Sequence, residues 1–395
     1  MNVNATISDT RNADVLVERA KSLVPALRQR AAQTLAERKL PAETIADFQR
    51  LELTRCLQPV KFGGYGADYR VFSRMLRALA QGCGSSAWVA AVHGEHNWVV
   101  GNYPEEAQRE VWGSNPHAVA SASVAPNGTA EKVSGGFRLS GSWGFASGID
   151  HAQWILLGGM VRGTGKPEPW MFLLPVSDVE IVDDWHVMGL CGTGSKSVVV
   201  KDAIVPAARA VTLHDLRHGT APGAAVHPDN PMVRTPRNLM AVFSLSSVVV
   251  GLAERAVAEL IEFNRERRSR GARVADIEAV QLMVSEAAAE AEAAALVGEH
   301  TIARNTALVE SRQDITAEHV AWSRRNSSYS TKLAQSATRL VFEAAGGTAL
   351  FTTSPLQEIY RDIAAGAAHV SLTWHRFAPF YAQIKLGQTV DFDSI

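Results

Sequence analysis

The chain has few of the residues that mark specialised protein classes. It contains only three cysteines, Cys56, Cys83 and Cys191, and no CxxC pair. An odd number of cysteines without that spacing excludes a disulfide framework and argues against a zinc site. We therefore expect no bound metal and a location in the reducing cytoplasm.

Charge of one sign and long apolar runs are also missing. The 39 basic and 40 acidic residues leave a formal net charge of −1, which favours neither nucleic acid nor a membrane as a partner. The longest nearly apolar run, 239–253, is interrupted by serines and is shorter than the ~20 residues of a membrane span. Residues 1–20 lack the apolar segment of a secretory signal. No GxGxxG follows a predicted strand, so no NAD(P)H site is expected.

The chain does have enough apolar material for a sizeable core. Hydrophobic residues make up 46% of its 395 residues and charged residues 20%, which is typical of globular proteins. A chain of this length is expected to form two or three domains, or one large subunit with several layers.

The spacing of apolar residues divides the chain into regions. Over 14–113 these residues recur every three or four positions, which predicts helices. Over 118–211 they alternate with period two between Gly, Pro and Asn turns, which predicts strands. The segment 217–236 has no clear periodicity, and long loops of this kind are often functional. Four long helical patterns then predict an up-down bundle, over 239–268, 277–308, 317–345 and 355–381.

These regions predict an α+β fold with three domains. We expect a helical domain over 1–115, a central antiparallel β domain over 116–225 and a C-terminal four-helix bundle over 226–395.

One helix of the first region carries unusual polar residues. The stretch AWVAAVHGEHNWVV (87–100) is rich in Ala and Val, yet it contains Trp88, His93, His96 and Asn97. A buried imidazole without a partner costs free energy, so these histidines are either satisfied core residues or part of a site. Trp88 and His96 are separated by roughly 80° around a helix, so both can face one cavity.

The order of the three regions and several motifs resemble the acyl-CoA dehydrogenase superfamily over nearly the whole chain. The resemblance is greatest to the oxygenase components of two-component flavin-dependent aromatic monooxygenases, such as 4-hydroxyphenylacetate 3-hydroxylase and 3-HSA hydroxylase. No single motif would be specific, but all of them recur in one order. They are GSSAWVAAVHGEHNW (84–98), YPEEAQREVWG (103–113), ASASVAPNG (120–128), GSWGFASGIDHAQW (141–154), WHVMGLCGTGSKSVVVKD (185–202), EAAGGTALFTTSPLQEIYRD (343–362) and AAGAAHV (364–370).

The resemblance implies a flavin between the β domain and the bundle. In the family, a hydroxyl at the position of Ser147 meets flavin N5, and the positions of Phe145 and Ala146 give backbone contacts. Such a hydroxyl suits the chemistry, because reduced flavin reacts with oxygen to give a C4a-hydroperoxide that must be shielded and hydrogen-bonded.

A second flavin segment departs from the family pattern. The family has a small polar residue where this chain has Ala122. Strand alternation puts Ser121 and Ser123 on the face opposite Ala122. Either Ser123 supplies the flavin contact or this hydroxyl is missing, and Ser121 is a candidate for contact with the substrate.

The resemblance also assigns roles to the unusual helix. His96 matches a histidine that hydrogen-bonds the phenolic hydroxyl of the substrate, and Trp88 matches a tryptophan that touches the flavin. A neutral imidazole with an ordinary pKa near ~6.5 is suited to share the phenol proton. His93 is expected to be structural, and Asn97 is expected to hold a backbone or supporting contact.

The positions of the dehydrogenase base carry no suitable carboxylate. Acyl-CoA dehydrogenases need such a base to remove the α-proton of the thioester. One known position falls in YRDIAAGAAHVSLTW (360–374), which has no glutamate, and the other falls in NLMAVFSLSS (238–247). His369, in the first stretch, instead matches an oxygenase histidine beside the flavin.

The phosphate tail of the flavin has candidates near the second half of the bundle. In the superfamily, a basic residue and a glycine pair from a neighbouring subunit hold this tail, which here implies Arg265, with Arg267 and Arg268 as alternatives, and Gly346 with Gly347. A tail held by two subunits implies an oligomer, and the resemblance implies that it is a homotetramer.

The segment VHPDNPMVRTPRN (226–238) lies over the substrate in the family. Its Arg234 or Arg237 is expected to neutralise a substrate anion, to approach the flavin, or simply to cap a helix. Of the two, Arg237 is the predicted substrate-binding residue.

The predicted function is that of an oxygenase component. It would take reduced FMN or FAD from a separate flavin reductase, bind O2, and hydroxylate a small aromatic, phenolic substrate. Three alternatives stay open at this point. These are an acyl-CoA dehydrogenase-like enzyme with a relocated base, a relative that oxygenates nitrogen or sulfur, and an oligomeric scaffold without flavin.

Overall fold

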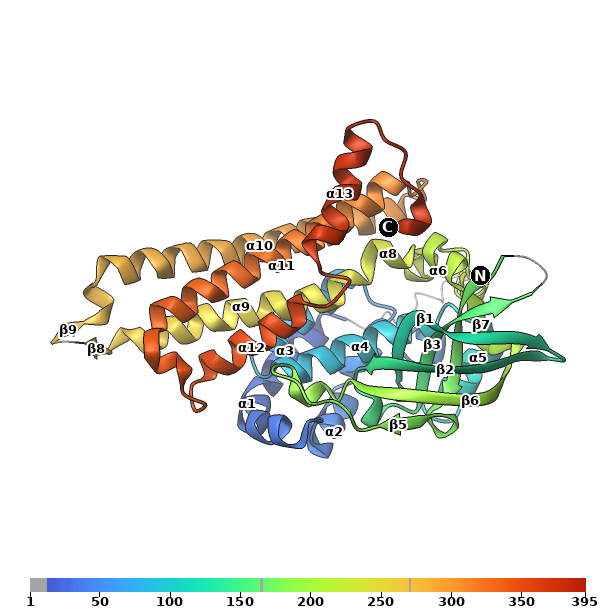
Figure 1. The fold of residues 1–395 in the computed structure, drawn as a ribbon, viewed down its shortest axis with the longest axis horizontal. Coiled ribbons are helices and arrows are strands. Elements are labelled where there is room, and N and C mark those ends of the chain that lie inside the picture. The colour runs from blue at the N-terminus through green and yellow to red at the C-terminus, as the bar shows by residue number, and fades with distance from the viewer. Residues whose placement is uncertain (1–12, 164–165, 270) are drawn as a thin grey trace, which may run out of the picture.

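The N-terminal region is helical, as its periodicity predicts (Figure 1). The computed structural model describes residues 13–163, 166–269 and 271–395. Residues 1–12, which include part of the stretch without a secretory signal, lie outside the described residues. The helices are α1 (Val15–Glu37), α2 (Ala42–Arg50), α3 (Tyr69–Ala80), α4 (Gly84–Val100) and α5 (Glu105–Trp112), with the short turns η1 (Leu53–Arg55) and η2 (Val60–Phe62).

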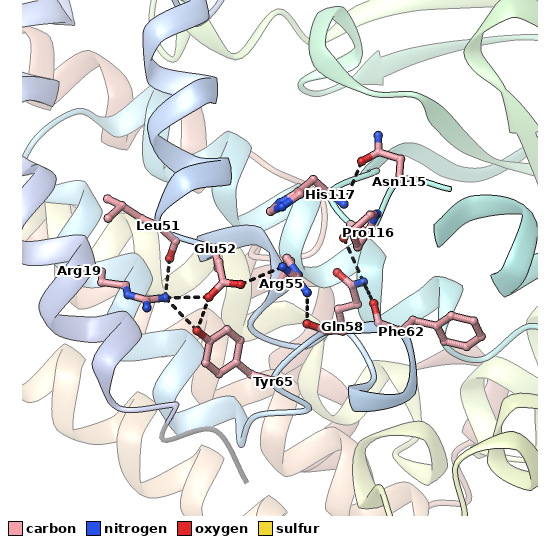
Figure 2. Close-up of polar contacts among 11 residues, drawn as sticks. Arg19, Leu51, Glu52, Arg55, Gln58, Phe62, Tyr65, Asn115, Pro116 and His117 are labelled. Atoms are coloured by element: carbon pink, nitrogen blue, oxygen red, sulfur yellow. Dashed lines mark hydrogen bonds and ion pairs between the residues drawn. The ribbon is translucent and has the colours of Figure 1, made fainter. Parts of the chain in front are cut away.

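A polar cluster joins α1 to the segment that leads into the sheet (Figure 2). Arg19 on α1 donates to the carboxylate of Glu52 at 3.1 Å and to the Tyr65 hydroxyl at 2.8 Å. Glu52 also accepts from Arg55 at 2.8 Å. Gln58 then donates to the backbone oxygen of Pro116 at 3.2 Å. These bonds fix the helical region against the start of the β region.

The central region is a seven-stranded sheet in the order β5-β6-β2-β1-β3-β4-β7. The prediction of an antiparallel sheet is wrong for one pair, because β1 and β3 run parallel. After β2 the chain crosses to the other side of β1, and β3 then runs in the same direction as β1. A period-two pattern predicts strands but not their direction, so it cannot reveal this pairing. The strands are β1 (Ala120–Val133), β2 (Gly136–Ala146), β3 (Trp154–Arg162), β4 (Glu168–Pro175), β5 (Glu180–Val182), β6 (Lys196–Pro206) and β7 (Ala210–Thr212).

The segment without periodicity contains short helical turns rather than a bare loop. They are α6 (Leu213–His218), α7 (Gly223–Val226), η7 (Pro231–Arg234) and α8 (Arg237–Met240). Side-chain caps start two of them: Thr212 accepts from the backbone of Asp215, and Asn230 accepts from that of Met232. Elements this short have too few turns to show a helical period.

The C-terminal region is a helical bundle, and its last predicted helix is broken in two. The helices are α9 (Val242–Arg265), α10 (Glu278–Glu310), α11 (Ala317–Ala345), α12 (Pro355–Ala367) and α13 (Trp374–Lys385). The break at 368–373 has a local cause. The backbone N–H of Ser371 is bonded to Nδ1 of His369 at 3.2 Å, so it is not available to continue the helix.

Helix α4 lies where the sheet and the bundle meet (Figure 1). All of its residues from Gly84 to Val100 are buried. It packs against β1 on one side and α9 on the other. One continuous helical run, Arg237–Arg265, is long and apolar enough to cross a membrane by length and composition, but 89% of its apolar window is buried inside the fold. Such burial is the pattern of a core helix.

Candidate flavin and substrate site

The polar residues of α4 each contact another element. His93 donates from Nε2 to the backbone oxygen of Gly148 at 3.1 Å, and Asn97 donates to the backbone oxygen of Thr54 at 2.9 Å. A Cβ at position 148 would lie 2.6 Å from Nε2 of His93, so glycine is required there. His93 and Asn97 therefore make the supporting contacts that the sequence predicts for them.

His96 is held in a single tautomer. Its Nδ1 lies 2.9 Å from the backbone oxygen of Ala120 on β1. A carbonyl can only accept, so Nδ1 carries the proton and Nε2 of the neutral ring has a free lone pair. Burial lowers the pKa of His96 to about 3, which corrects the ordinary value expected from the sequence. His96 is therefore expected to be neutral over the physiological range, with Nε2 available to accept a hydrogen bond.

His369 is held in the opposite tautomer. The backbone N–H of Ser371 can only donate, so Nδ1 of His369 accepts and Nε2 carries the proton. Burial lowers the pKa of His369 to about 4. Its ring meets that of Trp88 edge to face, with centroids 5.9 Å apart. The structure thus brings together the two residues that the sequence places beside the flavin.

Ser121 and Ser123 of β1 face the end of β2 and the residue that follows it. Ser121 donates to the backbone oxygen of Ser147 at 2.9 Å, and Ser123 donates to that of Gly144 at 2.8 Å. Both hydroxyls thus lie on one face, as strand alternation predicts. Both protons are used to hold the 144–147 segment in place. Ala120, which holds His96, directly precedes Ser121 on the same strand.

The hydroxyl of Ser147 ends a chain of three hydroxyls. Thr193 donates to the backbone oxygen of Leu190 at 2.8 Å and lies 2.7 Å from Ser195. Ser195 lies 2.7 Å from Ser147. Each hydroxyl has one proton to donate, so Ser195 donates to Thr193, and Ser147 donates to Ser195. The lone pairs of Ser147 are then free to accept from a ligand N–H, which is what a reduced flavin presents at N5.

The segment before Ser147 presents an exposed aromatic ring. Phe145 has a positive φ of 64° and a 73% exposed side chain. Its ring packs edge to face against Trp185, with centroids 5.9 Å apart. Exposed apolar surface of this kind marks a ligand site or an interface. Phe145 presents apolar surface and Ser147 presents a hydroxyl acceptor, so together they fit the flavin edge that the sequence predicts at these residues.

A buried charged group lies on the bundle side of α4. Glu95 accepts from Arg237 at 2.8 Å and from the Ser244 hydroxyl at 2.6 Å. Arg237 is the predicted substrate-binding arginine, and the structure pairs it with a carboxylate next to His96 in sequence. Arg234 instead donates to the backbone oxygen of Pro228.

Sequence reasoning missed Glu95, Ser195 and Thr193. A carboxylate between two histidines of a largely apolar helix is a visible signal for Glu95. The two hydroxyls had no such signal, because serine and threonine in a Gly-rich turn are common.

The predicted phosphate residues are only partly brought together. Arg265 is exposed and pairs with Glu262 at 3.1 Å. Arg267 donates to the backbone oxygen of Ala345 at 2.9 Å, directly before Gly346 and Gly347. Within one chain, Arg267 rather than the predicted Arg265 therefore lies at the glycine pair.

One group outside this site has the composition of a metal site, which the sequence does not predict. The ligating atoms of His214, His218 and Asp393 lie within 4.8 Å of one another. The two imidazoles contact the carboxylate of Asp393 at 3.3 and 3.2 Å. These contacts join α6 to the C-terminal segment.

The comparisons with known proteins show the family of this chain. Residues 15–115 match the N-terminal domain model of acyl-CoA dehydrogenases, and residues 241–374 match a C-terminal domain model. The chain is 34% identical over 384 residues to the oxygenase component of an FADH2-dependent resorcinol hydroxylase from a Rhizobium species, covering 94% of each chain. It is 28% identical to the oxygenase component of p-hydroxyphenylacetate 3-hydroxylase from Acinetobacter baumannii, covering 95% of this chain and 90% of that one.

Solved structures show the same relationship. The 3-HSA hydroxylase from Rhodococcus sp. RHA1 superposes with a TM-score of 0.92 at 33% identity, over 96% of this chain and 99% of that chain. XiaF from a Streptomyces species, solved with FADH2 and glycerol, superposes with a TM-score of 0.90 at 26% identity, over 96% and 97%. The chain therefore belongs to the acyl-CoA dehydrogenase superfamily, within the family of flavin-dependent monooxygenase oxygenase components.

Proposed function

We propose that this chain hydroxylates a small phenolic substrate with O2 and a reduced flavin supplied by a separate flavin reductase. The main support for the proposal is that hydrogen bonds connect both His96 and Ser147 to neighbouring residues of β1. His96 is bonded to Ala120, and Ser147 is bonded to the adjacent Ser121. The predicted substrate acceptor and the predicted flavin acceptor are thus fixed to consecutive residues of β1.

Each residue of the site has a role in this proposal. Reduced flavin, when bound, supplies the activation of O2. Ser147 accepts a hydrogen bond at the flavin edge, and Nε2–H of His369 offers a donor beside Trp88. Nε2 of His96 accepts a hydrogen bond from the phenol hydroxyl and takes over more of its proton as the ring carbon attacks oxygen. This partial loss of the phenol proton increases the electron density of the ortho carbon.

Reduced FAD is the flavin we propose. The Rhizobium relative is named for FADH2, and XiaF was solved with it. We also propose a homotetramer, as the resemblance implies, and the 65% and 66% exposure of Leu350 and Phe351 beside the glycine pair supports an interface at this place. The three cysteines are free, which supports the proposed cytoplasmic location.

The test supplies reduced FAD without a reductase and follows the product under isotopically heavy O2. A phenol should gain one heavy oxygen on its ring, and the matching methyl ether should gain none, because it has no proton for His96. Equal labelling of phenol and ether would contradict the role of His96. Reduction of bound FAD by an acyl-CoA, without ring labelling, would instead establish a dehydrogenase.

A further inference from the structure

Two histidines and one aspartate form a group outside the flavin and substrate site, and they come from two distant parts of the chain. His214 and His218 both lie on α6, one helical turn apart, so they share one face of that helix. Asp393 belongs to the C-terminal segment 391–395, which reaches α6 (Figure 1). The ligating atoms of the three side chains lie within 4.8 Å of one another. Two histidines with this spacing on one helix recur in zinc sites.

The carboxylate of Asp393 lies between the two imidazoles. Its Oδ2 is 3.3 Å from Nδ1 of His214, and its Oδ1 is 3.2 Å from Nε2 of His218. In a tetrahedral zinc site, bonds of about 2.0–2.2 Å place neighbouring ligand atoms roughly 3.3–3.6 Å apart. The spacing between the carboxylate and each imidazole is therefore close to that of ligands around one ion.

Neighbouring contacts orient the aspartate and one of the histidines. The ring of Phe392 stacks on that of His218, with centroids 4.5 Å apart. The carboxylate of Asp391 accepts from the backbone N–H of Asp393 at 3.3 Å. Metal ligands are commonly oriented by outer contacts of this kind. The side chain of His214 is 63% exposed, so an ion can enter from the solvent and this ring can rotate to meet it.

The donor set indicates the class of ion. Two imidazole nitrogens and one carboxylate oxygen suit Zn²⁺ and the divalent transition metals close to it, whereas Ca²⁺ and Mg²⁺ prefer oxygen ligands. Three protein ligands leave a fourth position for water. The small number of cysteines does not argue against this set, because it contains no thiolate. The competing arrangement has no ion, and the carboxylate accepts hydrogen bonds from both imidazoles.

We propose that His214, His218 and Asp393 bind one Zn²⁺ ion, and that this ion fixes the C-terminal segment to α6. The segment is also held on α8, where the side chain of Asn238 donates to the backbone oxygen of the buried Ile395 at 3.0 Å. The ion adds a second attachment, because it binds only where ligands from both parts of the chain meet. The proposal does not rest on the proposed function, since it requires neither flavin nor substrate.

The test uses the full-length protein, purified without a histidine tag and freed of metal by a chelator. Calorimetric titration should show saturable binding of one Zn²⁺ per chain. His214→Ala, His218→Ala and Asp393→Asn should each weaken this binding at least roughly tenfold, because loss of a ligand costs more than loss of an outer contact. Co²⁺ serves as a visible substitute, and the wild type should give the strong absorption of a tetrahedral site.

His375→Ala is the matched control. His375 is an exposed histidine on α13, outside the group, so its loss should leave the affinity for Zn²⁺ unchanged. Hydrogen exchange tests the attachment of the C-terminal segment. Zn²⁺ should slow the exchange of the backbone N–H groups of Asp393 and Ile395 in the wild type, and should not slow it in His218→Ala.

Three results would overturn the proposal. The first is a wild type that shows no saturable binding of Zn²⁺, or only the weak Co²⁺ absorption of an octahedral site. The second is wild-type affinity in all three site variants, which would mean an adventitious ion only. The third is hydrogen exchange of the C-terminal segment that does not respond to Zn²⁺. The Co²⁺ spectrum of the wild type needs no variant, so it decides the outcome even if a variant fails to fold.

Discussion

The two sides of the site differ in how completely their polar groups are satisfied. On the β side, the hydroxyls of Ser121, Ser123, Ser195 and Thr193 all donate to a backbone oxygen or to another hydroxyl. On the bundle side, the guanidinium of Arg324 stacks on Phe377 but forms no hydrogen bond among the described residues, and the Nε of Arg237 is enclosed without a hydrogen-bond partner. A satisfied network can be rigid before a ligand arrives, whereas a buried polar group without a hydrogen bond costs free energy.

His96 and His369 also differ between the β side and the bundle side. His96 is fixed by a carbonyl of the sheet, and His369 by an N–H of the bundle. One ring therefore presents an acceptor and the other a donor, although burial keeps both neutral. The difference lies in the backbone group that each ring meets, rather than in the residue type.

The largest effect is expected at His96. His96→Ala removes the acceptor for the phenol and should lower ring hydroxylation by roughly 10²–10³-fold. Oxygen uptake, product and peroxide release should be measured together, with peroxide rising as product falls. The affinity for reduced FAD serves as the control and should be unchanged. Hydroxylation at the wild-type rate would show that another group accepts from the phenol.

Glu95→Gln tests the charged side. The change leaves Arg237, whose side chain is 21% exposed, without its counter-charge and should destabilise the fold by about 1–3 kcal/mol. The measurement is the free energy of unfolding in urea. Ser244→Ala removes only the neutral donor to Glu95 and should cost less. If the glutamine variant were as stable as the wild type, the ion pair would not hold α8 against α4.

Ser195→Ala tests the hydroxyl chain on the other side. Ser147 would lose the acceptor of its proton, and one buried hydrogen bond is worth about 1 kcal/mol, or roughly fivefold in rate. We expect the fraction of oxygen that ends in product to fall. Because both residues act as one unit, Ser147→Ala combined with Ser195→Ala should be no worse than Ser147→Ala alone. Additive losses would show that the two hydroxyls act independently.

The smallest effect is expected from pH. His96 has a folded pKa of about 3, below the ordinary value of 6.5. Its contribution to stability is therefore complete above the ordinary pKa and is lost as the pH falls through the folded pKa. The hydroxylation rate should show no acid limb between about pH 5.5 and 7.5 that reports His96. An acid limb of the rate profile near the ordinary histidine pKa would contradict the structure if that limb is lost in the His96→Ala variant.

Local patterns predicted a large part of this molecule. The three regions follow from apolar spacing, and the common face of Ser121 and Ser123 follows from alternation along one strand. The parallel pairing of β1 and β3 could not be predicted, because a crossover leaves no trace in periodicity. The break after α12 depends on a ring-to-backbone contact of His369.

Contacts that span long sequence separations were the hardest to predict. Glu95 and Arg237 are 142 residues apart, so neither stretch alone indicates the pair. The low pKa of His96 is also a tertiary property, since burial is its largest cause. The motif order still predicted site roles for His96, Ser147, Trp88 and His369, because family motifs carry information that composition does not, and these roles stay predictions.

Ring-nitrogen NMR of the histidines tests most directly whether the backbone fixes His96 and His369 in opposite tautomers. Signals can be assigned by their loss in His96→Asn and His369→Asn variants. At about pH 7, where neutral histidine dominates, His96 should carry its proton on Nδ1 and His369 on Nε2. A His96 ring protonated on Nε2, or on both nitrogens, would contradict its role as the acceptor for the phenol.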